Sequence, residues 1–117
     1  MNVEIWQDYA SCWSVSDAQR SALLPAAVAP GVQYRDPNAE VRGVAELAGY
    51  MADFQRAMPG HRFAIRGVEA HHRRSLARWQ QLDAAGRAVA DGISYAIHDE
   101  QGKLADITGF FAARGRP

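Results

Sequence analysis

The sequence has a single cysteine, Cys12, among its 117 residues, so no disulfide can form within the chain. Its 13 basic residues are balanced by 13 acidic ones, and a net charge of zero gives no general attraction to nucleic acid or to an anionic membrane. No apolar run approaches the roughly 18 residues that a membrane-spanning helix needs. We therefore expect a cytoplasmic protein that has neither a nucleic acid nor a membrane as its partner.

The sequence also lacks the common signatures of metal and cofactor sites. His71 and His72 are adjacent rather than spaced as ligands on a helix, and no cysteine or carboxylate set completes a zinc site. There is no glycine-rich phosphate loop, no Gly-x-Ser-x-Gly elbow and no cysteine–histidine pair. We accordingly expect no metal and no cofactor. His61 and His98 are single histidines, and a surface or satisfied position explains each better than catalysis.

The first sixty residues have the spacing of helices. Trp6, Tyr9 and Trp13 fall on one face of a predicted first helix, and that face is unusually aromatic. Ser16 and Gln19 form a capping box, which predicts the start of a second helix.

Prolines and glycines predict where the later part of this helical region is interrupted. Pro25 should kink or shorten the second helix, and Pro30-Gly31 should end the region. A short extended piece is expected at residues 32–34. A third helix is predicted from the apolar period that starts after Gly43, and Pro59-Gly60 should stop it.

From residue 61 onward the pattern becomes alternating, which predicts strands joined by hairpins. Turns are expected at residues 71–74, 83–86 and 100–103, and the last two strands at residues 87–98 and 104–111. Three helices followed by such a sheet make an α+β fold. With 48% hydrophobic residues there is enough apolar surface for one core, so we expect a single domain over residues 1–117.

The long strand predicted at residues 87–98 has two unlike faces. One is bulky and apolar, and the other is nearly all small, with Ala88, Ala90, Gly92, Ser94, Ala96 and His98. A small face leaves empty volume unless larger groups fill it, so we expect an apolar pocket there, walled by the aromatic helix face. Ordinary core packing on both faces of a curling sheet is the alternative. The bulky face also needs cover, and a second copy of the chain is the simplest cover.

The order of these elements and several short motifs resemble the nuclear-transport-factor-2-like superfamily, in particular its SnoaL-like polyketide-cyclase and ketosteroid-isomerase branches. The motifs are YRDP at 34–37, RG at 42–43, PG at 59–60, RW at 78–79, G-x-S-x(7)-GKL at 92–104 and GFF at 109–111. The resemblance implies a cone, in which a curved mixed or antiparallel sheet wraps over the three N-terminal helices and encloses a cavity. It also implies a homodimer through the outer sheet face. Function transfers less directly, because isomerases, cyclases, dehydratases and binding proteins share this frame.

Asp36 stands where the resemblance implies the proton-shuttling aspartate of the ketosteroid isomerases, in the same Asp-Pro context. A carboxylate at the rim of an apolar cavity is poorly solvated, which makes it a better base. The alternative is a turn before Pro37, with the Asp36 side chain bonded to the backbone. The sequence leaves both readings open.

Tyr9 and Ser94 are the other candidate catalytic residues. The resemblance implies an oxyanion-holding role for Tyr9, because a phenol in a dry cavity stabilises a developing enolate. Alternatively, Tyr9 completes the apolar helix face with its hydroxyl at the surface. Ser94 lies where relatives often carry an aspartate. Its hydroxyl can donate a hydrogen bond but is neither acid nor base near pH 7, which departs from both the isomerase and the cyclase arrangements.

The candidate wall of the cavity is apolar and aromatic, and consists of Trp13, Tyr50, Phe54, Trp79, Ile107 and Phe111. As a group they favour a small apolar or aromatic molecule as the guest, although core packing explains each one singly. Two functions follow. In the first, an isomerase, cyclase or dehydratase uses Asp36 as general base while Tyr9 and Ser94 hold the substrate oxygen. In the second, the same fold is a ligand-binding or dimerisation module without catalysis.

Overall fold

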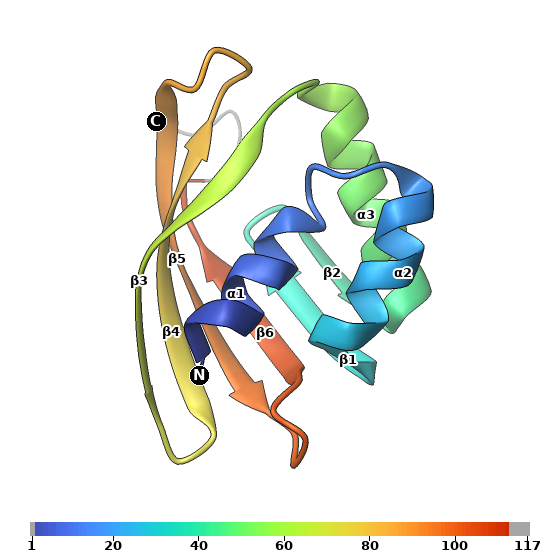
Figure 1. Cartoon of the computed structure of the whole chain (residues 1–117), viewed down its shortest axis with the longest axis vertical. Coiled ribbons are helices and arrows are strands. Elements are labelled where there is room, and N and C mark those ends of the chain that lie inside the picture. Colours follow the sequence, from blue (N-terminus) through green and yellow to red (C-terminus); the bar gives the residue numbers. More distant parts are fainter. Residues whose placement is uncertain (1, 113–117) are drawn as a thin grey trace.

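The computed structural model describes residues 2–112, which form helices and one sheet, with the strands β1 and β2 coming before the third helix (Figure 1). In chain order the elements are α1 (Asn2–Ser11), α2 (Asp17–Ala27), β1 (Val28–Asp36), β2 (Ala39–Arg42), α3 (Val44–Ala57), β3 (Arg62–His71), β4 (Arg74–Leu82), β5 (Ala88–His98) and β6 (Leu104–Phe110). The strand order is β2-β1-β6-β5-β4-β3, with β1 and β6 parallel and the other neighbours antiparallel. The helices lie on one side of this curved, unclosed sheet (Figure 1). The expected α+β class is confirmed.

The second helix, α2, begins where the capping box predicts it. The Ser16 hydroxyl accepts the backbone N–H of Gln19 at 3.2 Å, and the Gln19 side chain accepts the backbone N–H of Ser16 at 3.1 Å. Each bond satisfies a donor that has no partner within the helix. Pro25 lies in the last turn, and the helix ends at Ala27. No helix in the described part of the chain is long and apolar enough to cross a membrane.

The expected break at Pro30-Gly31 is wrong. Both residues lie inside β1, which begins at Val28 and whose pairing with β6 shifts register between Val28 and Gln33. A bulge at this point accommodates a proline, because proline has no N–H to donate to the ladder. The extended piece is therefore longer than the expected residues 32–34. The short strand β2, which was not predicted, pairs antiparallel with the second half of β1.

The two faces of β5 are oriented as the alternation predicts. Ser94, Ala96 and His98 are buried on the side of the helices, whereas Ile93 and Tyr95 on the opposite side are exposed. The cross-strand register places Ser94 beside Gly109 of β6 and Ile93 beside Phe110. The inner face of the sheet is therefore lined with small residues at this point, and its outer face carries bulky apolar ones.

A chain of buried polar groups ties α1 to the sheet. The Trp6 indole N–H donates to Ser75 Oγ on β4 at 2.8 Å, and this oxygen lies 2.6 Å from His98 Nε2 on β5. His98 Nδ1 donates to the Gly102 carbonyl at 2.9 Å. All three side chains are buried. His98 is thus a core histidine whose two ring nitrogens both have partners.

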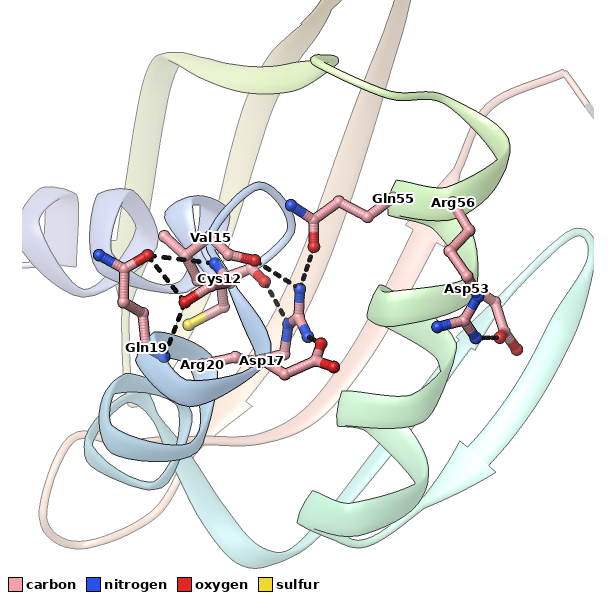
Figure 2. A network of polar contacts seen from close by, with 9 residues as sticks. Cys12, Val15, Asp17, Gln19, Arg20, Asp53, Gln55 and Arg56 are labelled. Atoms are coloured by element: carbon pink, nitrogen blue, oxygen red, sulfur yellow. Dashed lines mark hydrogen bonds and ion pairs between the residues drawn. The ribbon is translucent and has the colours of Figure 1, made fainter.

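Arg20 joins the helices to one another (Figure 2). This buried arginine donates to the carbonyls of Cys12 and Val15, each at 2.8 Å, and to the side chains of Asp17 and Gln55. A buried guanidinium is costly unless its donors are satisfied, so the partners from α2, α3 and the loop after α1 fix one geometry. The helical period places Arg20 on the same face of α2 as Leu24 and Ala27, although its charge gave no reason to expect burial.

Candidate functional site

Asp36 is the last residue of β1, and its carboxylate is held by hydrogen bonds. Oδ2 accepts the phenol protons of Tyr34 at 2.5 Å and Tyr50 at 2.9 Å. Oδ1 accepts the backbone N–H groups of Asn38 at 2.8 Å and Ala39 at 3.0 Å. The prediction that the Asp36 side chain bonds to the backbone of the turn is therefore correct. The same side chain also points inward to the two tyrosines. The two alternatives left open by the sequence do not exclude each other.

The tyrosines around Asp36 keep their protons. Burial raises the pKa of Tyr34, and the negative charge of Asp36 raises it further. The pKa of Tyr50 is raised by burial and then by Asp36 in the same way. Together with the two backbone N–H groups they supply four donors, and a carboxylate has about four acceptor positions. In this geometry Asp36 has no free acceptor position for a substrate proton. Tyr50 is half-buried whereas Tyr34 is buried, so Tyr50 is the phenol that can move away from Asp36.

Asp36 and Ser94 stand on either side of Gly109 on the inner face of the sheet. The pairing of Arg35 with Thr108 brings Asp36 beside Gly109, and Ser94 is the register partner of Gly109 from the other side. A Cβ built on Gly109 would lie 3.5 Å from Ser94 Oγ and 3.6 Å from Asp36 Cβ. These are ordinary van der Waals contacts, so a methyl group fits at this position. We call this position, bounded by Asp36 and Ser94, the Gly109 notch.

Trp79 fills part of the small face of β5. Its ring lies against Gly92, where a Cβ would come within 2.0 Å of it, and its N–H donates to Ser94 Oγ at 3.0 Å. The ring also contacts Phe63 and Phe111, with centroids 5.2 and 5.9 Å away. The space that the small face leaves is therefore partly occupied by an aromatic side chain from the neighbouring strand.

The predicted wall residues divide into two sets. Trp13 and Ile107 are buried in the core, and the Trp13 ring has five aromatic neighbours: Tyr9, Tyr34, Tyr50, Phe54 and Phe63. The other four candidates are half-buried and lie nearer to solvent: Tyr50, Phe54, Trp79 and Phe111. Tyr50 bonds to Asp36 and Trp79 bonds to Ser94, whereas Phe111 lies beside Trp79 and Phe54 beside Trp13. We call these four half-buried side chains the aromatic rim.

Tyr9 is buried rather than at the surface, so the alternative of a surface hydroxyl is wrong. Its ring packs edge-on against Trp6 and Trp13. Burial raises the pKa of Tyr9, which keeps the phenol protonated. Tyr9 therefore belongs to the core beneath the rim.

Two hollows on the described surface lie away from these residues. One is lined by residues around β2, including Gln33 and Arg42, and the other by residues of α2 and α3, including Asp17 and Gln55. Neither touches Asp36, so an enclosed pocket stays a prediction. Within residues 2–112, no three histidine, cysteine or acidic side chains gather as a metal site would require.

The sequence reasoning missed the phenol contacts of Asp36. Tyr34 had a usable signal, because residues two apart on a strand share one face and Tyr34 is two residues before Asp36. Tyr50 had none, since it reaches Asp36 from a different element, α3. The bond from Trp79 to Ser94 was also missed, although it follows once β4 and β5 are in register.

The fold of this chain is similar to that of several solved structures. The chain superposes on a proposed isomerase of the SnoaL-like family from Agrobacterium tumefaciens with a TM-score of 0.88 and 24% identity, over 96% of this chain and 97% of that one. A proposed SnoaL-like polyketide cyclase from Jannaschia gives 0.75 and 15%, over 94% and 84%. A de novo designed protein with a curved β-sheet gives 0.71 and 10%, over 95% and 84%. These identities show the fold alone.

The family is shown by the sequence itself. No curated protein matches the chain significantly. The family model of the SnoaL-like domain, however, matches residues 6–111, which include every element from α1 to β6 except the first residues of α1. This chain therefore belongs to the SnoaL-like domain family, as its motifs predicted.

Proposed function

We propose that this chain binds a small apolar or aromatic molecule at the Gly109 notch. The supporting observation is that Gly109 carries no side chain and has Asp36 on one side and Ser94 on the other. The half-buried aromatic rim supplies apolar surface for a flat guest, and the two polar side chains would orient it. A few polar groups within a mostly apolar lining are typical of small-molecule sites.

A second candidate function is catalysis in the isomerase or cyclase class, with Asp36 as the general base. It is favoured by the inward direction of the carboxylate and by the half-buried position of Tyr50. Tyr50 would leave Asp36 when substrate binds and so free an acceptor position. Asp36 would then take a proton from the carbon next to a carbonyl, the C–H electron pair would move towards the carbonyl oxygen, and Ser94 would donate a hydrogen bond to that oxygen.

The binding proposal is tested by filling the notch. In Gly109→Ala the new methyl meets Ser94 and Asp36 at ordinary contact distances, so the fold is kept, but the guest's place is taken. Thermal unfolding is measured with steroids, aromatic polyketides and fatty acids. A ligand at a hundred times its Kd stabilises the native protein by about 2.7 kcal/mol. That stabilisation should vanish in Gly109→Ala and persist in Gly31→Ala, where a Cβ meets nothing. If both variants respond like the wild type, the notch is not the site.

The catalytic candidate has its own test. Asp36→Asn keeps a side chain that fits the turn but removes the base. If a ligand of the wild type is turned over, Asp36→Asn should abolish turnover while retaining binding. Full activity in Asp36→Asn would exclude Asp36 as the base. Binding without turnover in the wild type would leave the non-catalytic function.

We further propose that two copies pair through the outer face of the sheet. Ile93 and Phe110 are cross-strand neighbours there, with exposed fractions of 41% and 60%, and Tyr95 lies on the same face of β5. Exposed bulky apolar side chains in register are costly in water, and a twofold partner removes them from it. The proposed location is the cytoplasm, and the buried, unpaired Cys12 agrees with a reducing compartment.

A further inference from the structure

The ring of Trp79 occupies the space that small residues leave on the inner face of β5. It lies over Gly92, where a Cβ would come within 2.0 Å of it, and its N–H reaches Ser94 Oγ at 3.0 Å. Ser94 in turn bounds the Gly109 notch, because a Cβ on Gly109 would lie 3.5 Å from the same oxygen. The indole therefore lies at the edge of the notch, on the side of β4.

The contacts of this ring allow it to move without opening the sheet. Besides its hydrogen bond to Ser94, the ring has two edge-on aromatic neighbours, Phe63 and Phe111, with centroids 5.2 and 5.9 Å away. All three rings are half-buried, so this cluster borders on solvent. Phe111 follows Phe110, the last residue of β6, so strand pairing does not fix its backbone. Trp79 can therefore turn outward while every strand stays paired.

The proposed binding site is closed in this conformation. Neither of the two hollows on the described surface touches Gly109, Asp36 or Ser94. A guest at the notch needs space that side chains fill here, and the side chain that fills the adjoining space is Trp79. The ring that closes the site is itself a flat aromatic group.

We infer that Trp79 is a built-in plug, whose indole takes the place of a guest and turns outward to open the notch, and that the guest is a planar bicyclic aromatic molecule of about indole's size. The inference rests on the proposed binding function and deepens it with a closed state and a ligand class. A space that is packed around a two-ring side chain accepts a free molecule of the same shape, because close packing depends on matched volume.

The opening of the plug is tested in the wild-type protein by hydrogen exchange of the tryptophan indole N–H groups, followed by NMR. The Trp79 and Trp6 signals are assigned from Trp79→Phe and Trp6→Phe. Trp6 is 1% exposed and bonded to Ser75, so its N–H should exchange only when the protein unfolds. The Trp79 N–H should exchange at least about tenfold faster, at a rate that low concentrations of urea do not change, because a local opening exposes little new surface. Equal rates with the same urea dependence would mean that the ring leaves only on global unfolding, which overturns the inference.

The ligand class is tested by removing the plug. Trp79→Ala leaves an apolar cavity, the kind of space that takes up small aromatic molecules. A guest that competes with a plug open about a tenth of the time or less binds at least about tenfold more weakly. Isothermal titration calorimetry should therefore show that Trp79→Ala binds indole at least about tenfold more tightly than the wild type. Trp79→Leu keeps more of the apolar contact and serves as the second variant if Trp79→Ala does not fold.

Phe110→Ala is the matched control for this comparison. It also removes an aromatic side chain, but from the outer face of the sheet, where Phe110 is 60% exposed. Its affinity for indole should equal that of the wild type. An affinity of Trp79→Ala no greater than that of the wild type overturns the inference.

Saturation of the wild type with indole separates the inference from the proposed function. Displacement of the plug should speed the exchange of the Trp79 N–H further, since the ring then stays in solvent. Indole binding that leaves this exchange unchanged or slower overturns the plug and leaves the binding function standing. Local opening and tight indole binding in Trp79→Ala, without binding by the wild type up to the solubility limit of indole, supports the plug and removes the binding function for this class of molecule.

Discussion

The ring of Trp79 lies against the Cα of Gly92, its register partner on β5, so closely that a methyl group there would come within 2.0 Å of the ring. Gly92→Ala should therefore push Trp79 aside, break its bond to Ser94 and destabilise the fold by about 1–3 kcal/mol. Urea denaturation measures this. Gly31→Ala, where a Cβ meets nothing, is the matched control and should be nearly neutral. Equal stability of the two variants would contradict the close contact.

The two phenols on Asp36 should contribute unequally to stability. Tyr34 is buried, so in Tyr34→Phe the carboxylate loses a hydrogen-bond donor and water cannot reach the position to replace it. The free energy of unfolding should fall by about 1.5–3 kcal/mol. Tyr50 is half-buried, and water can take the place of its hydroxyl, so Tyr50→Phe should cost about 1 kcal/mol or less. The free energy of unfolding of both variants, measured in urea at neutral pH, gives the order. The reverse order would mean that Tyr50 is the tighter partner.

Alkaline pH should destabilise the protein. Burial raises the pKa of Cys12 to about 11 and raises the pKa of Tyr9 and Tyr34 as well. Because these folded-state pKa values lie above those of the unfolded chain, their contribution is complete below about pH 8.5, where the unfolded thiol starts to ionise. Stability should then fall as the pH rises, more steeply above about pH 10, where unfolded tyrosines ionise. Urea denaturation between pH 7 and 11 checks this.

The same pH series contains an internal control. Tyr34→Phe removes one of the buried phenols, so its stability should fall less steeply above about pH 10 than that of the wild type. An unchanged slope would mean that Tyr34 ionises equally easily in the folded and unfolded chains.

Ser75 should be more important than its size suggests. Ser75→Ala leaves the buried Trp6 indole N–H without its acceptor and His98 Nε2 without its partner. An unsatisfied buried polar group costs about 1–3 kcal/mol, so the loss should lie in or above this range. Thermal and urea unfolding measure it. Ser21→Ala, on the exposed side of α2, is the control and should change stability by less than about 0.5 kcal/mol.

The outer face should govern self-association. Ile93→Glu places a charge in the apolar patch beside Phe110, so a dimer formed there should dissociate. Leu23→Glu is a close match, because Leu23 is 42% exposed on α2 while Ile93 is 41% exposed. Sedimentation velocity should give a dimer for the wild type and Leu23→Glu and a monomer for Ile93→Glu. A dimer in all three would place the interface elsewhere.

Local sequence signals determined the elements of this protein. The capping box at Ser16 and Gln19, the aromatic face of the first helix and the alternation along residues 88–98 each concern neighbours within one element. The period of a helix or strand is fixed by backbone geometry, so these features are readable without knowing the partners. The order of elements then pointed to the SnoaL-like family, which the family model confirms.

Only the tertiary structure showed which residues of the candidate site form hydrogen bonds with one another. The inward contact of Asp36 depended on Tyr50, fourteen positions later on a helix, and the hydrogen-bond partner of Ser94 is Trp79 from the neighbouring strand. The bulge at Pro30-Gly31 likewise follows from parallel pairing with β6, at the far end of the sequence. Hydrogen bonds and ring contacts between distant segments depend on distance and angle, and these exist only once the sheet has its register.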